Sequence, residues 1–243
     1  GYLALSGLLL EIAARFRVRN VYGVMVLAGI YGMLNGLILN PASALIDVPR
    51  TLITRAMGAH ALVGLVALAA FLLLTRAHRR RSQVAALGIA LVLGIGWGSW
   101  SRWTPVALNG QGETSLLTLF GCTAAGVGVV ALALLNARHG AEDAPDLRLG
   151  LRGWAFTLIT LGGLLILHLL QREIDLISLV VIITLTVFSV MIIWFQQRKK
   201  GAALFENLAP PAWGMFAGLA VAFALAGVVG YHLPRGDASN DPV

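Results

Sequence analysis

The sequence predicts an all-α integral membrane protein, a helical bundle of about eight transmembrane helices joined by short loops. Hydrophobic residues make up 58% of the 243 residues and charged residues only 12%, and the mean hydropathy is +0.83. Soluble domains carry about 25% charged residues. The charges that are present gather in short clusters between long apolar runs, which is typical of a polytopic helical membrane protein.

Eight apolar segments follow one another along the chain, and we treat residues 1–243 as a single transmembrane domain. A hydrocarbon core about 30 Å thick requires about 20 apolar residues in a helix. The first segment is short and begins with Gly1, so we expect the true N-terminus to lie upstream or to have been processed. The expected spans are 1–14, 20–39, 57–74, 83–103, 115–136, 153–170, 176–195 and 212–231.

Lysine and arginine are distributed unevenly between alternate loops. Thirteen of the 18 fall on one predicted side, in the loops around Arg17, Arg80, Arg148 and Lys199, and five fall on the other. The positive-inside rule assigns the first side to the cytoplasm and the C-terminus to the outside of a cell inner (cytoplasmic) membrane. Because these residues flank apolar runs and form no stripe of their own, we exclude nucleic acid as a partner.

Two stretches next to the outer surface have a composition of their own. Pro41 and Pro49 disfavour helix in the residues before them, so we expect residues 41–55 to be irregular or briefly helical. Trp97, Trp100 and Trp103 are three apart. They are typical of an aromatic belt at the headgroup level, and the alternative is a shelf, including Trp97 and Trp100, that contacts a pigment or quinone.

Glycines inside the spans indicate close helix packing. Three pairs are four residues apart, about one helical turn, so each pair opens a groove in which another helix can approach closely. The same grooves would accept a helix of a partner subunit or a flat, lipid-like ligand. The pairs are Gly32 with Gly36, Gly94 with Gly98, and Gly214 with Gly218.

Polar groups inside the spans are few. We interpret Glu11 as the structural partner of Arg15, which follows at i+4 on the same helical face. The middle of every other expected span lacks Asp, Glu, Lys and Arg, which argues against a proton-driven pump. Asn35 lies deep in the second span, and we expect it to hydrogen-bond to a neighbouring helix or, in a transporter, to line the pathway.

Three of the five histidines fall at outer ends of expected spans: His60, His168 and His232. Two imidazoles at one depth on different helices suit the axial ligands of a haem b or a pigment metal, for which His60 and His168 are the candidates. Adding His232 gives a possible metal site. The alternative is that histidine collects at interfaces because it is apolar at one end and polar at the other.

An enzyme receives little support from the sequence. Cys122 is the single cysteine, which rules out an internal disulfide, and without a nearby base we interpret it as an inert packing residue. Motifs of serine hydrolases, P-loops, zinc proteases and dinucleotide sites are absent. Acids in the outer loops, such as Glu113 and Asp47, keep a lipid-linked sugar transferase as an alternative, but short loops leave little room for its substrate.

These observations favour a non-catalytic integral membrane subunit, a scaffold or accessory component of a larger membrane complex. We expect its partners to be membrane lipids and other membrane protein subunits, with lipid or an apolar cofactor in the glycine grooves. The first alternative is a small-molecule transporter with Asn35 near its pathway. The second is an electron-transfer subunit that binds haem b or a pigment through His60 and His168.

Overall fold

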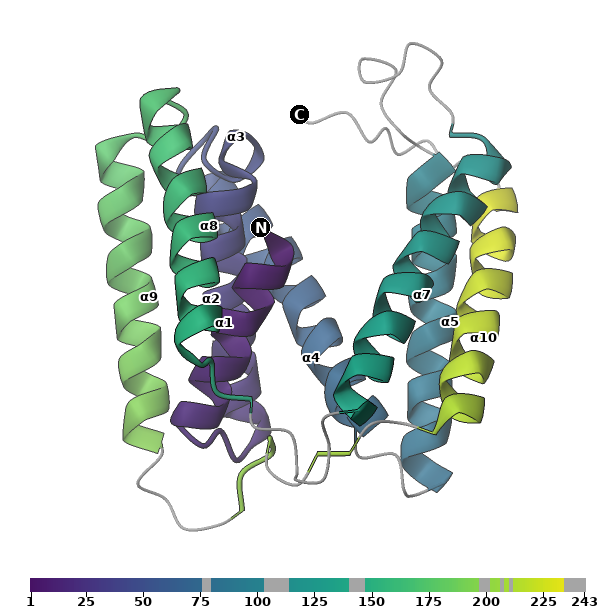
Figure 1. Cartoon of the computed structure of the whole chain (residues 1–243). Coiled ribbons are helices and arrows are strands. Elements are labelled where there is room, and N and C mark those ends of the chain that lie inside the picture. The colour runs from purple at the N-terminus through teal and green to yellow at the C-terminus, as the bar shows by residue number, and fades with distance from the viewer. Residues whose placement is uncertain are drawn as a thin grey trace. The chain divides into compact units, whose positions relative to one another are not determined.

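The computed structural model describes residues 1–75, 80–102, 114–139, 147–196, 202–205, 208–209 and 212–233, and within these ranges it contains helices and no strand (Figure 1). Two of the helices, η1 and η2, have the wider π-helical geometry. The helices are α1 (Tyr2–Arg15), α2 (Val21–Leu34), η1 (Asn35–Leu39), α3 (Pro41–Ala44), η2 (Leu52–His60), α4 (Ala61–Thr75), α5 (Arg80–Arg102), α7 (Leu116–His139), α8 (Leu151–Leu170), α9 (Leu176–Gln196) and α10 (Trp213–His232).

Each expected span coincides with helix, and six stretches in the described part of the chain are long and apolar enough to cross a membrane. The all-helical membrane class is therefore supported, whereas the count of about eight spans is not confirmed. The helix α1 has only 14 residues, and the apolar part of α7 is the shorter stretch Leu116–Leu132. The six candidates are Val21–Leu39, Leu52–Thr75, Arg80–Ser99, Leu151–Leu170, Leu176–Gln196 and Trp213–His232.

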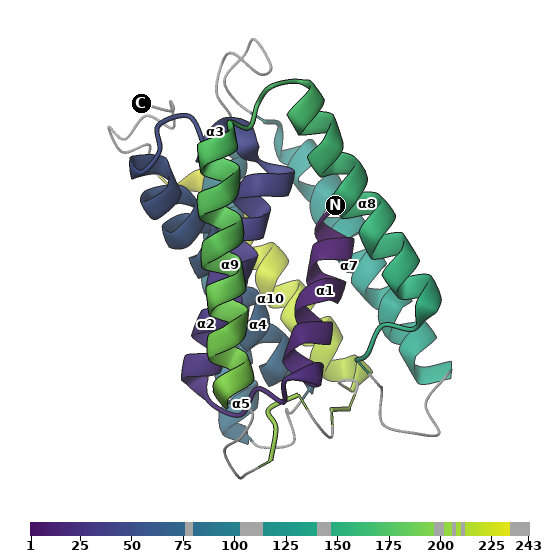
Figure 2. The same cartoon turned by 90° about the vertical axis from the view of Figure 1, so that its left-hand side faces the viewer.

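The chain divides into two compact units, which we describe separately. The first unit comprises Gly1–Leu72 and Asp146–Asn207, and the second comprises Leu73–Pro145 and Leu208–Val243. The core of the first unit is built around α2, whose Leu27, Ile30 and Met33 are buried together with Leu5 of α1 and Ile182 of α9. Figure 2 shows α1 beside α8 and α2 beside α9 in this unit.

Neighbouring helices of the first unit run antiparallel. Gly1 lies next to Leu164 near the end of α8, whereas Glu11 contacts Leu149 just before α8 begins. Likewise Gly23, at the start of α2, lies next to Gln196 at the end of α9. The end of α1, the start of α8 and the end of α9 therefore share one end of the unit, the lower end in Figure 1.

That shared end carries most of the unit's described arginines. The lower end has five, whereas the opposite end has three, Arg50, Arg55 and Arg172. The fold thus brings loops that are far apart in sequence to the same end, as alternating spans require. The five arginines of the lower end are Arg15, Arg17, Arg19, Arg148 and Arg152.

The second unit is dominated by a close, parallel contact between α5 and α10. A Cβ atom added to Gly98 would collide with the Gly227 carbonyl oxygen and would lie 2.7 Å from the Tyr231 amide nitrogen. One turn earlier, a Cβ on Gly94 would meet the Ala226 Cβ at 2.8 Å. The Gly94–Gly98 groove expected from the sequence is therefore occupied, by a helix more than 120 residues further along the chain.

Candidate functional site

The two π-helices pack against one another in the first unit, around Gly32 and Gly36. A Cβ on Gly36 would meet the Ala44 Cβ at 2.9 Å and the Ala56 Cβ at 3.0 Å, and a Cβ on Gly32 would collide with the Ala56 carbonyl oxygen. This glycine pair is thus a packing groove, as expected. Because π-helical turns are rare and are frequently found at functional sites, their pairing marks this region as the first candidate.

Asn35 begins η1 and is 4% exposed. Its side-chain oxygen accepts a hydrogen bond of 2.9 Å from the Asn40 amide group, which also donates to the Tyr2 hydroxyl at 3.1 Å. The Asn40 backbone N–H donates to the Asn35 carbonyl oxygen at 2.9 Å, as π geometry requires, and this contact places the two side chains together. Asn35 therefore hydrogen-bonds to a residue five positions further along the chain and not to a neighbouring helix. Asn40 makes the hydrogen bond to α1, through Tyr2.

The span that contains His60 begins earlier than expected. The sequence predicts its start at Met57, but helix already begins before Leu52, so His60 is the last of nine π-helical residues. Its Nδ1 atom is buried and has no hydrogen-bond partner among the described residues. A buried imidazole nitrogen without a hydrogen-bond partner is energetically unfavourable. The contacts of the fold therefore do not explain why a histidine stands at position 60.

His168, in contrast, has a structural explanation. The end of α8 forms a Schellman motif: Glu173 N–H donates to the His168 carbonyl oxygen and Arg172 N–H to that of Leu169. Arg172 adopts the left-handed conformation this motif needs, with φ of 57°. The His168 Nδ1 lies 2.6 Å from a Glu173 carboxylate oxygen, so a polar contact occupies the place where such motifs usually have an apolar one.

Within the described ranges no group of three His, Cys, Asp or Glu side chains could hold a metal ion, and the three-histidine metal site stays a prediction. His60 and His168 both belong to the first unit, whereas His232 belongs to the second, where its ring lies edge-on to Tyr231 at 5.4 Å. Ligation of a haem or pigment by His60 and His168 remains a prediction. Glu173 would then orient the His168 ring and leave its Nε2 as the ligand atom.

The indole N–H of Trp97 is used inside the second unit, and the aromatic belt stays a prediction. It donates a 3.0 Å hydrogen bond to the Thr123 hydroxyl of α7. The Tyr231 hydroxyl donates to the Thr114 carbonyl oxygen, so α7 is held to both α5 and α10. The side chain of Trp100 and the whole of Trp103 lie outside the described residues.

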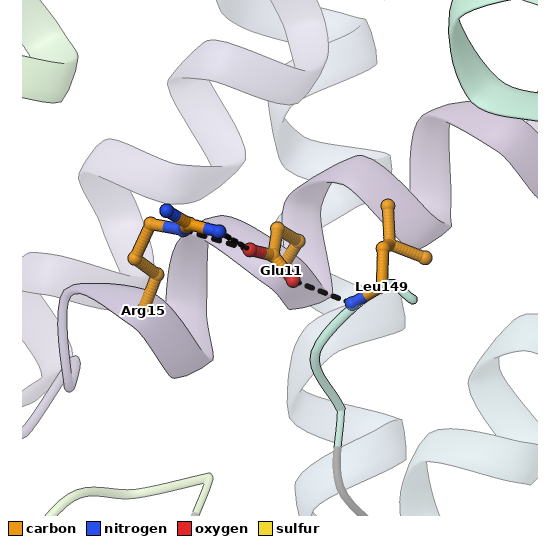
Figure 3. A network of polar contacts seen from close by, with 3 residues as sticks. All are labelled: Glu11, Arg15 and Leu149. Atoms are coloured by element: carbon orange, nitrogen blue, oxygen red, sulfur yellow. Dashed lines mark hydrogen bonds and ion pairs between the residues drawn. The ribbon is translucent and has the colours of Figure 1, made fainter. Parts of the chain in front are cut away.

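Glu11 forms a buried polar network in the first unit (Figure 3). One carboxylate oxygen accepts two contacts of 2.7 Å from the Arg15 guanidinium, which confirms the predicted pair. The other accepts a 2.6 Å hydrogen bond from the Leu149 backbone N–H. Glu11 is only 1% exposed, whereas Arg15 is 57% exposed. The pair therefore attaches α1 to the start of α8.

The helix α7 has an uncovered face of small residues. Leu119 is its only buried residue among those whose exposure is described, and it lies on the side that carries Thr123. On the other side, Thr118, Gly121, Cys122 and Ala125 are exposed and recur at helical spacing. We call these four residues the α7 small-residue face. Cys122 is thus exposed rather than packed in the fold as expected.

Gly214 and Gly218 of α10 also differ from expectation. A Cβ on either would meet no atom within 4 Å, whereas Gly227 and Gly230 of the same helix make the contact with α5.

Comparisons with known proteins do not identify the chain: no family model matches it, and neither does any curated protein or solved structure at a significant level.

Proposed function

We propose that the protein is a multi-pass inner (cytoplasmic) membrane protein in which all eight apolar segments cross the bilayer. The arginine-rich ends face the cytoplasm and the C-terminus lies outside. The gathering of Arg15, Arg17, Arg19, Arg148 and Arg152 at one end of the first unit supports this orientation. The 24 residues of α7 extend about 36 Å, which exceeds a hydrocarbon core of about 30 Å.

Within that membrane the protein acts as a non-catalytic subunit of a larger complex. The observation that carries this proposal is the α7 small-residue face, which no described residue of the second unit covers. Small residues allow helix backbones to approach closely, and helices in lipid associate by this packing and not by the hydrophobic effect. An uncovered small-residue face is therefore better suited to a helix of another subunit than to lipid chains.

The polar groups of the spans support the same function because most of them are committed to the fold. Glu11 binds Arg15 and Leu149, Asn35 binds Asn40, and His168 binds Glu173. These contacts give each group a structural role that does not require a substrate.

The native thiol of Cys122 provides the test. Membranes that contain the full-length protein are treated with a maleimide–benzophenone reagent and irradiated, so that the maleimide attaches to the Cys122 thiol and the excited benzophenone inserts into a C–H bond of a neighbouring chain. Adducts are separated by denaturing gel and identified by mass spectrometry. We expect one defined adduct, because a docked helix holds a partner close to Cys122. A chain that runs alone on native gels and forms no adduct contradicts the proposal.

Two variants control that experiment. Cys122→Ala should abolish the adduct. Gly163→Cys in the Cys122→Ala background places a thiol on an exposed, open position of α8 and reports random collision in the bilayer. Equal yields from Gly163→Cys and wild type would show that Cys122 has no specific neighbour.

A second function, the small-molecule transporter, is favoured by the paired π-helices. They form the end of one candidate span and the start of the next, beside the buried Asn35, and such changes of helical geometry are frequent at functional sites. Proteoliposome swelling with a panel of small polar solutes tests it. A transporter would pass at least one solute faster than empty liposomes, and Asn35→Leu would slow that flux.

The haem or pigment alternative has a direct spectroscopic test. Protein purified in mild detergent either has a Soret or pigment band or has none. If a band is present, His60→Ala and His168→Ala should each remove or shift it, because loss of one axial ligand changes the coordination of the metal. A purified protein without a band after expression in a haem-replete host contradicts the alternative.

A further inference from the structure

Arg19 lies in the short turn between α1 and α2, at the arginine-rich end of the first unit. Its side chain is half-buried. Two of its guanidinium nitrogens, Nε and Nη1, are buried and have no hydrogen-bond partner in the described ranges. Buried donors of a charged group are costly to leave unpaired, so the guanidinium of Arg19 has unmet capacity for an anion.

The backbone on both sides of Arg19 is fixed. Before it, α1 ends in a Schellman motif in which Val18 N–H donates to the Ala13 carbonyl oxygen at 3.0 Å. After it, Asn20 caps α2 by accepting a 2.9 Å hydrogen bond from Gly23 N–H. The Val18 carbonyl oxygen accepts from Leu204 N–H at 2.7 Å, which holds a later segment against the turn. Arg19 is therefore presented at a defined place.

The one described acidic residue at this end of the unit is not available to Arg19. Five arginines lie at this end of the unit, and Glu11 is the one acidic residue there within the described ranges. Glu11 is already committed to Arg15 and to Leu149, so it cannot neutralise Arg19. The guanidinium of Arg19 itself is therefore available to an external anion.

We propose that Arg19 binds the phosphate of an anionic phospholipid in the cytoplasmic leaflet. A guanidinium presents parallel N–H donors that match two phosphate oxygens. Basic sites between helix ends at the cytoplasmic surface are where anionic headgroups bind. The partial exposure of Arg19 leaves a route by which the phosphate reaches it after rotation of the side chain. This inference rests on the proposed orientation and is independent of the proposed subunit role.

Native mass spectrometry of the full-length protein in detergent tests the site. The protein is titrated with phosphatidylglycerol, phosphatidylcholine or inorganic phosphate. We expect phosphatidylglycerol to bind more tightly than phosphatidylcholine, and Arg19→Gln to weaken the former by about fivefold, the effect of removing one basic residue near a charged membrane surface. Arg55→Gln, which removes a partly buried arginine from the opposite end, should leave phosphatidylglycerol binding unchanged.

Three results would overturn the proposal. Equal binding of phosphatidylglycerol and phosphatidylcholine by the wild-type protein would show that the net negative charge of the headgroup is not recognised. This comparison does not depend on any variant being folded. Equal losses for Arg19→Gln and Arg55→Gln would show a non-specific charge effect. Retention of inorganic phosphate in place of lipid would assign the arginine to a free anion. Loss of the Cys122 adduct, in contrast, bears only on the subunit proposal.

Discussion

Asp175 is the residue that begins α9, and it makes a testable contribution to stability. Its carboxylate accepts hydrogen bonds from the Ser178 hydroxyl and the Ser178 backbone N–H, as an N-cap does. Both hydrogen bonds hold the pKa of Asp175 below its usual value, and the bond from the Ser178 hydroxyl contributes more than the bond from the Ser178 N–H. The folded pKa is depressed, so the stabilisation is present above the unfolded pKa and is lost as the pH falls through the folded pKa.

Asp175→Ala should therefore lower the free energy of unfolding at pH 7. Because the site is exposed, we expect the low end of the range for N-caps, about 0.5–1 kcal/mol. Asp175→Asn keeps a capping oxygen and should retain most of the stability at pH 7, but without the acid-dependent loss. Thermal unfolding in detergent at pH 7 and below pH 4 measures both effects. Identical pH profiles for wild type and Asp175→Asn would contradict the assigned role.

Arg172 supplies a second residue-scale prediction. It adopts φ of 57° at the position of the α8 Schellman motif where glycine is usual. Arg172→Gly should raise stability by about 0.5–1 kcal/mol, since glycine has no Cβ to clash in this conformation. The control is Arg152→Gly in the first turn of α8, where glycine should reduce stability. Melting temperatures of the two variants should thus move in opposite directions, and a fall for both would refute the argument.

At this scale, sequence spacing predicts local contacts and misses distant ones. The Glu11–Arg15 pair follows from i,i+4 geometry, whereas the bond from Leu149 joins residues 138 apart and leaves no local pattern. The depth of His168 is readable in the sequence. Its contact with Glu173 is not, because it depends on Arg172 adopting a left-handed conformation that ordinarily marks glycine.

The contact between α5 and α10 is the main interaction at the scale of elements. Gly98→Ala should separate the two helices, because its Cβ would collide with the Gly227 carbonyl oxygen, which is backbone and cannot move aside. Gly96→Ala is the matched control, since no atom lies within 4 Å of its added Cβ on the same helix. We expect Gly98→Ala to lower the melting temperature by several degrees, and Gly96→Ala to have little effect or raise it slightly.

Equal melting temperatures for Gly96→Ala and Gly98→Ala would contradict the close packing.

Glycine spacing predicts that a groove exists but does not identify its occupant. Gly94 packs against Ala226 and Gly98 against Gly227. Gly214 and Gly218, equally well spaced in sequence, remain open. The π-helices were not predicted at all. In an apolar run nearly every residue is hydrophobic, so the change in helical period that would reveal a π-helix has no polar positions to mark it.

For the molecule as a whole, composition predicts the class and helix length does not settle the number of spans. Bilayer thickness constrains each span, but α7 combines a short apolar stretch, Leu116–Leu132, with enough further helix to cross. Its crossing depends on whether the residues after Leu132 enter the cytoplasmic headgroup region. That question is decided by which side of the membrane each of its ends reaches.

Cysteine labelling determines this topology in the Cys122→Ala background. Ile46→Cys, Ser115→Cys and Gly150→Cys place single thiols at exposed positions before α4, before α7 and before α8, respectively. With eight spans and the arginine-rich ends inside, a membrane-impermeant maleimide added to intact cells should label the thiols at positions 46 and 115 but reach position 150 only after permeabilisation. Labelling of positions 115 and 150 from the same side would mean that α7 does not cross the membrane. In that case Arg19 would still face the cytoplasm only if position 46 is labelled from outside.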